Sequence, residues 1–369
     1  MIMLPGKDRY RMHSFLTGMR QQGMTLTELM VAMLLGLLLI AAIIQIFTGS
    51  KQTYRTTEAS SVVQENGRFA DHFLSHDLRM AGFFGCLGES ELEFTNNVDA
   101  SSNKYPSDVS EAVNISVDNE LRAYAIGSSL PSDLGALGLA MGSNEGDVMP
   151  NTEAVLIRRA NQCPGGRVVP PLMGDQSANI KIADAESCGL EQNTVALITD
   201  CQTADAFGIT NNPVSGTKDT LTHSSALNLS NNLSTTYGED AWVYSMYAAV
   251  YYVGRDRAGE PSLYRRMLGK GGTMQAEELV GDIEDLAFEF GIDQDEDFVA
   301  DTYRDTSELS MADWARVVAV RYSFVARSHE GNVIDNVQEY RFDGQDMEGT
   351  DRRLRHVFTK TVSLRNRLK

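Results

Sequence analysis

Three aspartates alternate along one short stretch of the chain, at Asp293, Asp295 and Asp297. Carboxylates at these spacings occupy the first three ligand positions of an EF-hand calcium loop. The rest of that loop is missing, because Phe298 stands where the loop needs glycine and Arg304 stands where it needs a bidentate glutamate. The stretch is therefore a weak calcium candidate, and we expect a solvated acidic loop, since runs of like charge usually face water.

Two histidines, His72 and His76, lie four residues apart on an expected helix. This spacing can bind a metal, but Phe73 occupies the place where a zincin carries its glutamate, and a catalytic zinc needs a third ligand. The sequence contains no G-x-S-x-G elbow and no Walker A motif. Residues 268–273 (LGKGGT) lack phosphate-loop spacing and are expected to form a surface turn. We therefore expect no catalysis, no cofactor and no metal.

One carboxylate, Glu28, lies at the start of a strongly apolar stretch. In residues 29–47 only Gln45 is strongly polar, and these nineteen residues are long enough to span a bilayer as a helix. A carboxylate at membrane depth costs about 2.5–3.5 kcal/mol on insertion scales and is usually functional. The alternative is a glutamate that reaches up to the lipid headgroups.

The residues before this stretch are basic, with a net charge of +3 over residues 1–23. Positive charge holds that flank in the cytoplasm, so residues 51–369 are expected to be exported. A cleaved secretory signal has a shorter apolar region, about 7–15 residues, with small residues after it. Here Gly23 precedes the apolar run. A plain membrane anchor explains the length and the flanking charge, but it does not explain Glu28.

The overall charge of the chain is −18, which argues against general binding to nucleic acid because phosphate contacts need Lys and Arg. The charge is unevenly distributed. Residues 277–308 hold thirteen Asp and Glu against one Arg, and residues 351–369 hold seven Lys and Arg against one Asp.

The segment 23–32 (GMTLTELMVA) resembles the class III signal of type IV pilins and pseudopilins. The resemblance implies cleavage after Gly23 by a prepilin peptidase and N-methylation of Met24. Glu28 then lies at the fifth mature position, where the family has its glutamate. Met24 and Thr27 depart from the commoner phenylalanine and isoleucine without adding charge.

This resemblance also implies a partner for Glu28. In a filament of staggered helices, its carboxylate would meet the N-terminal ammonium of a neighbouring subunit. A paired charge is tolerated at low dielectric whereas an unpaired one is penalised, so Glu28 would select one register during assembly.

Further along, residues 79–86 (RMAGFFGC) and 352–368 resemble elements of PilW-type minor pilins, as do residues 197–201 and 280–293. The resemblance implies a minor pilin that takes part in initiating or assembling type IV pili, without catalysis. Expected partners are other minor pilins, the major pilin, the prepilin peptidase, the inner-membrane assembly platform and a tip adhesin. Two alternatives remain: a type II secretion pseudopilin of the J-like branch, and a membrane-anchored periplasmic enzyme.

Four parts are expected along the chain. Residues 1–23 are a cytoplasmic leader, residues 24–50 a transmembrane helix, residues 51–85 its periplasmic continuation, and residues 86–369 a globular head incorporated into the pilus. Gly67 would weaken the continuing helix by about 1 kcal/mol relative to alanine. A stripe at helical spacing is expected to pack on the head, and its residues are Phe69, Ala70, Phe73, Leu74, Leu78 and Ala81.

The head is expected to be α+β, with the long helix lying on an antiparallel sheet, because few elements alternate as strand, helix, strand. Residues 88–120 and 202–240 are rich in Ser, Asn, Thr, Asp and Gly and are expected to be surface loops. Six apolar or alternating runs predict strands, at residues 154–159, 194–199, 242–253, 285–292, 316–327 and 357–364.

The four cysteines include no C-x-x-C pair, so neither a zinc ribbon nor a thioredoxin-like motif is indicated. An even number in an exported region favours two disulfides over four free thiols. Cys188 and Cys201 lie thirteen residues apart around an expected strand, which favours pairing between them. Cys86 would then pair with Cys163.

Overall fold

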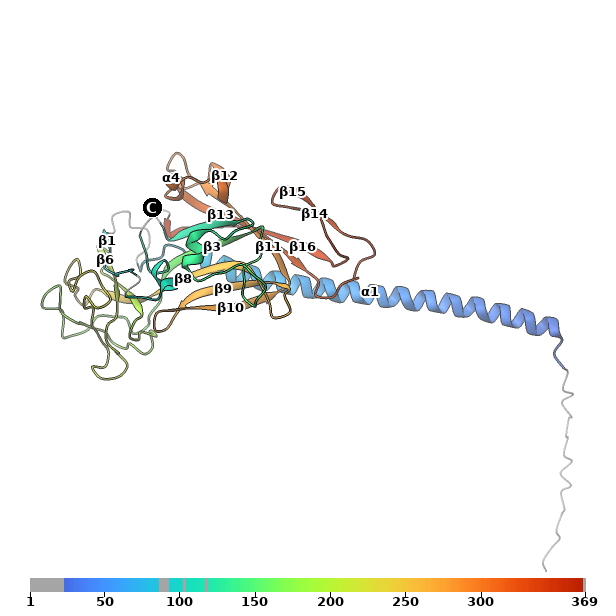
Figure 1. The fold of residues 1–369 in the computed structure, drawn as a ribbon, viewed down its shortest axis with the longest axis horizontal. Helices are drawn as coiled ribbons and strands as arrows, with labels where there is room; N and C mark the ends of the chain where they lie inside the picture. The colour runs from blue at the N-terminus through green and yellow to red at the C-terminus, as the bar shows by residue number, and fades with distance from the viewer. Residues whose placement is uncertain (1–22, 86–92, 102–103, 117–118, 368–369) are drawn as a thin grey trace, which may run out of the picture. The chain divides into compact units, whose positions relative to one another are not determined.

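A computed structural model describes residues 23–85, 93–101, 104–116 and 119–367. The chain divides into two compact units between Tyr54 and Arg55. The helix α1 (Leu26–Met80) contributes to both units, and every strand of the described residues belongs to the second (Figure 1).

Helix α1 contains no proline from Leu26 to Met80, so no residue interrupts its backbone hydrogen bonding. It ends where Gly82 adopts a φ of +73°, a left-handed conformation that glycine reaches without strain. Within the second unit, its buried residues recur every three or four positions, which turns one face of the helix toward the head. They are Val63, Gly67, Ala70, Leu74, Ser75, Asp77 and Leu78.

The larger sheet has eight strands and is organised around β8 (Trp242–Arg255). One edge of β8 pairs with β3 (Thr152–Asn161), and the other pairs first with β5 (Val195–Thr199) and then with β9 (Pro261–Gly269). All pairs in this sheet are antiparallel except that of β1 with β6. The outer strands are β2 (Leu121–Ile126), β10 (Thr273–Gly281), β6 (Thr203–Gly208) and β1 (Glu93–Asn96).

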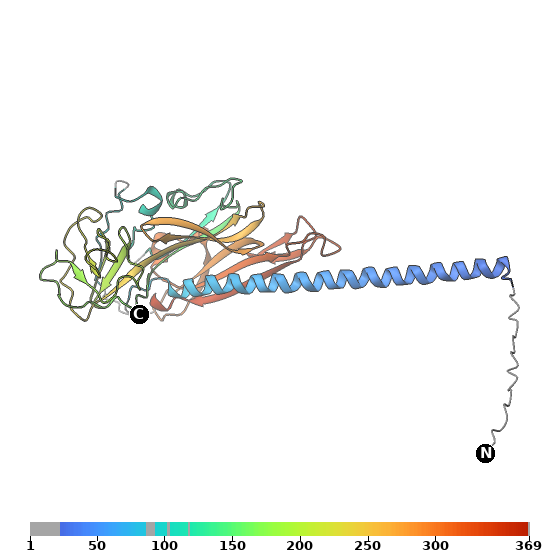
Figure 2. The same cartoon turned by 90° about the horizontal axis from the view of Figure 1, so that it is seen from below.

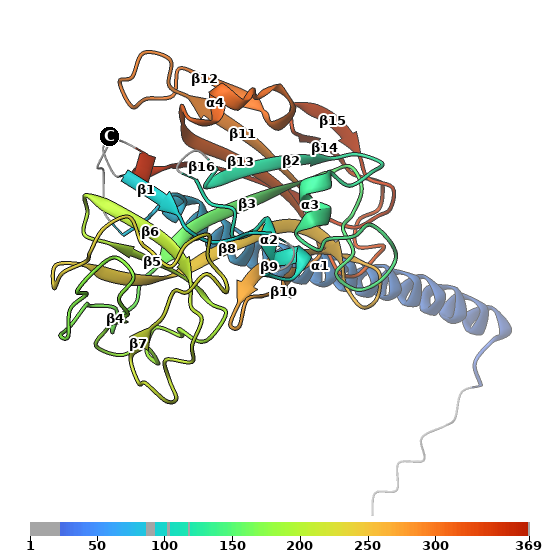
Figure 3. The same cartoon turned by 60° about the vertical axis from the view of Figure 1, so that its left-hand side comes forward.

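The smaller sheet is fully antiparallel, in the order β12 (Thr302–Asp305), β11 (Ile283–Ile292), β13 (Val317–Arg327) and β16 (Arg355–Ser363). Two small two-stranded sheets lie outside it (Figure 3). One joins β14 (Glu339–Phe342) to β15 (Gln345–Glu348), and the other joins β4 (Ile180–Lys181) to β7 (Thr220–Leu221). Short helical turns complete the head: α2 (Ser107–Ser110), α3 (Ser132–Ala136), α4 (Met311–Trp314), and 3-10 turns at Thr306–Glu308 and Arg365–Arg367.

The part of α1 in the second unit packs against both large sheets. Leu74 and Leu78 are fully buried in one apolar cluster that includes residues of β3 and β8 from the larger sheet, and of β11, β13 and β16 from the smaller one. Figure 2 shows this part of the helix running along the strands. Gly67 is essential to the approach, since a Cβ there would lie 2.1 Å from the Phe358 ring on β16.

The α+β fold expected from the sequence is confirmed, and each of the six expected strands is present within a few residues of its predicted limits. Within residues 268–273, residues 270–272 form the turn between β9 and β10, so the expected turn is present. The two expected surface loops are less irregular than predicted. Residues 88–120 include β1 and α2, and residues 202–240 include β6 and β7.

The predicted stripe on α1 is mostly confirmed, because Ala70, Leu74, Leu78 and Ala81 are fully buried and Phe73 packs against the same core. The prediction for Phe69 is wrong, since its side chain is 45% exposed. Phe69 points about 100° away from Ala70, its neighbour in the helix, and this turn places its side chain toward the exposed side of α1.

The predicted disulfide pairing is wrong. Cys163 pairs with Cys188, with their Cα atoms 4.6 Å apart, which excludes both the Cys188–Cys201 and the Cys86–Cys163 bonds. Cys201 is also disulfide-bonded, and Cys86 lies outside the described residues. The bonded pair is buried in a separate apolar cluster with residues of β4, β5 and β7. Sequence spacing could not reveal this cluster, because it forms between segments that are distant along the chain.

Candidate processing and assembly site

Gly23, Met24 and Thr25 precede α1 in a non-helical, exposed conformation. A Cβ added at Gly23 would meet no atom within 4 Å. The peptide bond after Gly23 is therefore held neither by helical hydrogen bonds nor by packing among the described residues. A peptidase needs such access to its substrate bond.

Thr25 and Glu28 cap the start of α1 reciprocally. The Thr25 backbone N–H and hydroxyl donate to Glu28 Oε2 at 3.0 and 2.9 Å, and the Glu28 N–H donates to the Thr25 hydroxyl at 3.3 Å. This arrangement is a capping box, in which a Thr and a Glu three residues later satisfy each other's backbone donors. The T-x-x-E spacing of residues 25–28 is the sequence signature of this motif, so the capping role of Glu28 can be predicted from the sequence although it was not among the expectations above.

The apolar part of α1 is exposed throughout. Its large apolar side chains from Leu26 to Phe47 are 46–76% exposed. By length and composition this helix is able to cross a membrane. Soluble proteins rarely leave so long an apolar surface in water, so its exposure favours a location in lipid or against neighbouring helices.

A buried polar network joins the other end of α1 to the larger sheet. Asp77 is 3% exposed and receives the hydroxyl hydrogen bonds of Tyr247 and, at 2.6 Å, Tyr251. Its other oxygen lies 3.0 Å from an Arg159 Nη atom. Burial raises the pKa of Asp77, but the tyrosine hydrogen bonds and the Arg159 charge outweigh it, so the pKa is lowered overall.

The two candidate histidines do not face a common metal position. His76 Nδ1 lies 3.0 Å from Asp77 Oδ1, and His72 packs edge-on against Phe73. Among the described residues, neither histidine belongs to a group of three or more potential ligands.

The three alternating aspartates do come together, with their ligand oxygens within 4.8 Å of one another. Asp293 is buried, and its two oxygens accept the N–H groups of Glu296 at 2.7 Å and Phe298 at 2.9 Å. Phe298 has a φ of +66°, so the sharp turn forms without the glycine of an EF-hand. The neighbouring carboxylates raise the pKa of Asp295. Because the Asp293 oxygens already bind the loop backbone, the stretch remains a weak calcium candidate.

The acidic and basic segments found in the sequence partly neutralise each other. Arg355 forms a two-point ion pair with Glu284, at 2.6 and 3.0 Å. Arg353 lies 3.8 Å from Asp282 and 3.2 Å from Glu260. These charges are therefore engaged within the head.

A cavity of 340 Å³ contains carboxylates that the sequence did not single out. Glu153, Asp285 and Asp343 line it, beside the β14–β15 hairpin. Burial raises the pKa of Glu153 and of Asp285 to about 7, and burial with nearby carboxylates raises that of Asp343. No ion pair with another described residue reaches these three carboxylates, in contrast to Asp77.

The long exposed apolar helix, its exposed Glu28 and its β-sheet head together define a pilin-like protein. The prokaryotic N-terminal methylation motif matches residues 18–44, and the model of type IV pilus-assembly protein W matches residues 250–366. These two matches support a type IV pilus minor pilin of the PilW family. The second match includes residues 280–293 and most of 352–368, whose resemblance was noted in the sequence. No curated protein and no solved structure matches the chain.

Proposed function

We propose that this protein takes part in the initiation and assembly of type IV pili, as a non-catalytic subunit present in few copies. The observation that carries the proposal is the exposed apolar half of α1, which presents Glu28 at its start. A head of residues 86–369 with long loops in 202–240 is bulky for a subunit repeated along a shaft. A few copies at one end of the filament avoid that restriction.

In this proposal, residues 1–23 are a cytoplasmic leader that prepilin peptidase removes after Gly23, and Met24 becomes the N-methylated first residue. Residues 24–50 cross the inner membrane, residues 51–85 continue into the periplasm, and the head docks with other minor pilins, the major pilin, the assembly platform and a tip adhesin. Mass spectrometry of the N-terminal peptide from membranes should find N-methyl-Met24. A chain that begins at Met1, or is cut after the apolar run, would contradict the proposal.

Glu28 has two roles in this proposal. Its Oε2 caps the helix, whereas Oε1 receives no hydrogen bond from the described residues and is free to meet the ammonium of a neighbouring Met24. Glu28→Gln separates these roles, because glutamine serves in a capping box but carries no charge. The variant should stay in the membrane yet enter filaments poorly. Normal incorporation would leave capping as the role of Glu28.

Deleting the gene separates the pilus from the secretion alternative. We expect surface pili and twitching motility to be lost or sharply reduced while type II secretion continues. Lost secretion with intact pili would instead favour a J-like pseudopilin. The intact chain should also be recovered with other minor pilins in substoichiometric amount.

A further inference from the structure

The β14–β15 hairpin has one face toward the head and one toward solvent. Tyr340 and Phe342 pack inward, in a small apolar cluster with Ala287 and Val325 of the smaller sheet. Because side chains alternate along a strand, Glu339 and its neighbours at alternate positions point outward. These outward-pointing residues are all exposed, in agreement with this assignment.

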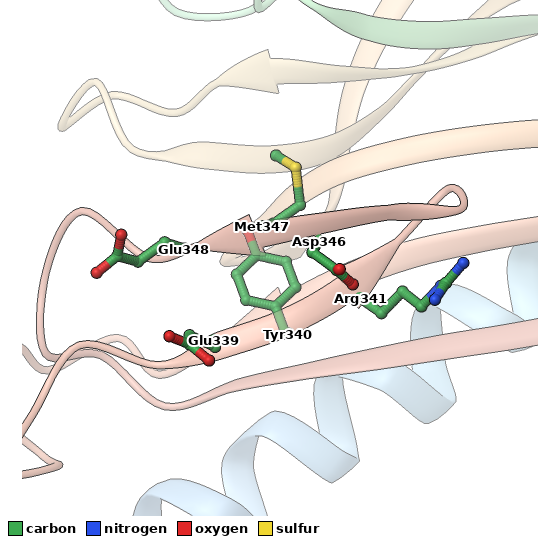
Figure 4. Close-up of a pocket in the computed structure, with 6 residues that line it drawn as sticks. All are labelled: Glu339, Tyr340, Arg341, Asp346, Met347 and Glu348. Atoms are coloured by element: carbon green, nitrogen blue, oxygen red, sulfur yellow. The ribbon is translucent and has the colours of Figure 1, made fainter.

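The outward face carries a repulsive pair. Glu339 and Glu348 are directly opposite each other in the antiparallel register, and Figure 4 shows them at the same end of the hairpin. Like charges at opposed positions destabilise a sheet. No ion pair with another described residue reaches either carboxylate. Residues 335–349 contain five acidic residues and only Arg341 as a cation, so the hairpin itself does not neutralise them.

Among the described strands, β14 and β15 pair only with each other, and the outer edge of β15 is the more exposed one. β14 is tied to the smaller sheet by Gln338, whose amide exchanges hydrogen bonds with the Arg355 backbone at 2.8 and 2.9 Å. Among the described strands, β15 pairs with β14 alone, and all four of its residues are exposed. A hollow of 560 Å³ lies on the hairpin, lined by residues that include Tyr340, Met347 and both opposed glutamates (Figure 4).

We propose that the β14–β15 hairpin docks an extended, lysine- or arginine-bearing segment of another pilus subunit, which pairs with the free edge of β15. Main-chain hydrogen bonds to an exposed edge supply affinity, and alternate side chains supply specificity. A cation on the outward side would relieve the repulsion between Glu339 and Glu348. Acidic residues also protect an edge against unselective pairing, and here they leave a basic strand as the matching partner.

The inference rests on the proposed function only for the identity of the partner as a pilus subunit. The hairpin itself can be tested whatever gene deletion does to pili. The probe is a fluorescein-labelled peptide, KTKTKT, titrated with the full chain in detergent micelles and followed by anisotropy. Two comparison probes are ETETET and a KTKTKT peptide N-methylated at alternate amides, which cannot complete the strand pairing.

Glu339→Gln with Glu348→Gln should weaken KTKTKT binding by about tenfold, as expected for lost charge complementarity at a docking surface. The control, Glu145→Gln with Glu308→Gln, makes the same change in net charge at exposed positions outside the hairpin and should bind like the unaltered protein. N-methylation should weaken binding by a similar factor, and ETETET should not bind.

Three results would overturn the proposal: equal losses in both double variants, equal binding of the N-methylated probe, or binding of ETETET. Equal losses in both double variants would mean that overall charge, and not the hairpin, determines binding. Equal binding of the N-methylated probe would mean that the peptide does not pair with β15 as a strand. Thermal unfolding guards against a folding artefact, because removing the repulsive pair should leave the melting temperature unchanged or raise it.

Discussion

Asp77 is a buried aspartate and Asp285 a partly buried one, and their surroundings are opposite. Asp77 is held by Arg159 and by the hydroxyls of Tyr247 and Tyr251, and its pKa is lowered. Asp285 accepts one backbone N–H, from Leu286 at 2.8 Å, and burial raises its pKa to about 7. Both carboxylates lose contact with water, so their pKa values differ because only Asp77 has a cation and several hydrogen-bond donors beside it.

This contrast separates two uses of a buried carboxylate. Where donors and a cation surround it, the charged form stabilises the packing of α1 on β8 and β3. Where they are absent, the charged form opposes folding, and the residue is retained at a stability cost. The Asp77 network, here called the joint, consists of Asp77, Arg159, Tyr247 and Tyr251 and stabilises the contact of α1 with the larger sheet. The carboxylates in the cavity beside the hairpin instead lower the stability of the head.

The largest effect is expected at the joint. Asp77→Asn should lower the free energy of unfolding by about 3 kcal/mol, because it leaves Arg159 buried without its counter-charge. Urea unfolding of the full chain in detergent would measure this.

Asp71→Asn, on the same helix, is the matched control. Asp71 bonds Tyr322 and Lys360 at 2.6 and 2.7 Å but is partly exposed, so about 1 kcal/mol is expected. Equal losses would show that burial of the pair is not decisive.

An intermediate effect of opposite sign is expected in the cavity. Asp285→Asn should raise the free energy of unfolding by about 1–2 kcal/mol at pH 8 and have little effect at pH 4, because the amide retains the acceptor without the charge. Thermal unfolding of both proteins across this range would measure the difference. A destabilised variant at pH 8 would mean that Asp285 has a cation partner.

The pKa values of Asp285 and Asp77 are shifted in opposite directions, and these shifts set the sign of the pH dependence of stability. The folded pKa of Asp285 lies above its unfolded value, so its contribution to stability falls as pH rises from about 4 to about 7. The folded pKa of Asp77 lies below its unfolded value, so its contribution is complete above pH 4 and is lost at lower pH. The unaltered head should therefore be most stable in mildly acidic solution. A profile that rises steadily from pH 4 to 7 would contradict the assignment.

The smallest effect is expected when one donor of the joint is removed. Tyr251→Phe should cost about 1 kcal/mol, because Asp77 keeps Tyr247 and Arg159. The same unfolding assay applies, with Tyr252→Phe as the neighbouring control. The Tyr252 hydroxyl bonds the Gly146 carbonyl at 3.0 Å, away from Asp77. A loss at Tyr251 as large as that of Asp77→Asn would indicate that the network acts only as a unit.

The sequence allowed the long helix, its buried stripe and six strands to be predicted, because periodicity reports which side of an element is buried. It did not predict β9 and β10, where residues such as Arg265 and Glu277 pair across the two strands and hide the apolar pattern. The Cys163–Cys188 bond and the Asp77 network depend on residues far apart in the chain, so spacing carried no information about them. The apolar surroundings of Glu28 mark it as unusual in the sequence, whereas its contact with Thr25 is indicated only by the T-x-x-E spacing.

Gly67 has a mechanical consequence. The ring of Phe358 occupies the space that a side chain at position 67 would fill, while Asn66 and Arg68 on either side of the glycine carry side chains. Sliding α1 along its axis by one residue, about 1.5 Å with a 100° turn, would bring one of those side chains against the ring. A pulling force on the helix would therefore be opposed by a steric clash with Phe358 on β16. The force would be transmitted to the smaller sheet, whose strands resist shear through their hydrogen bonds.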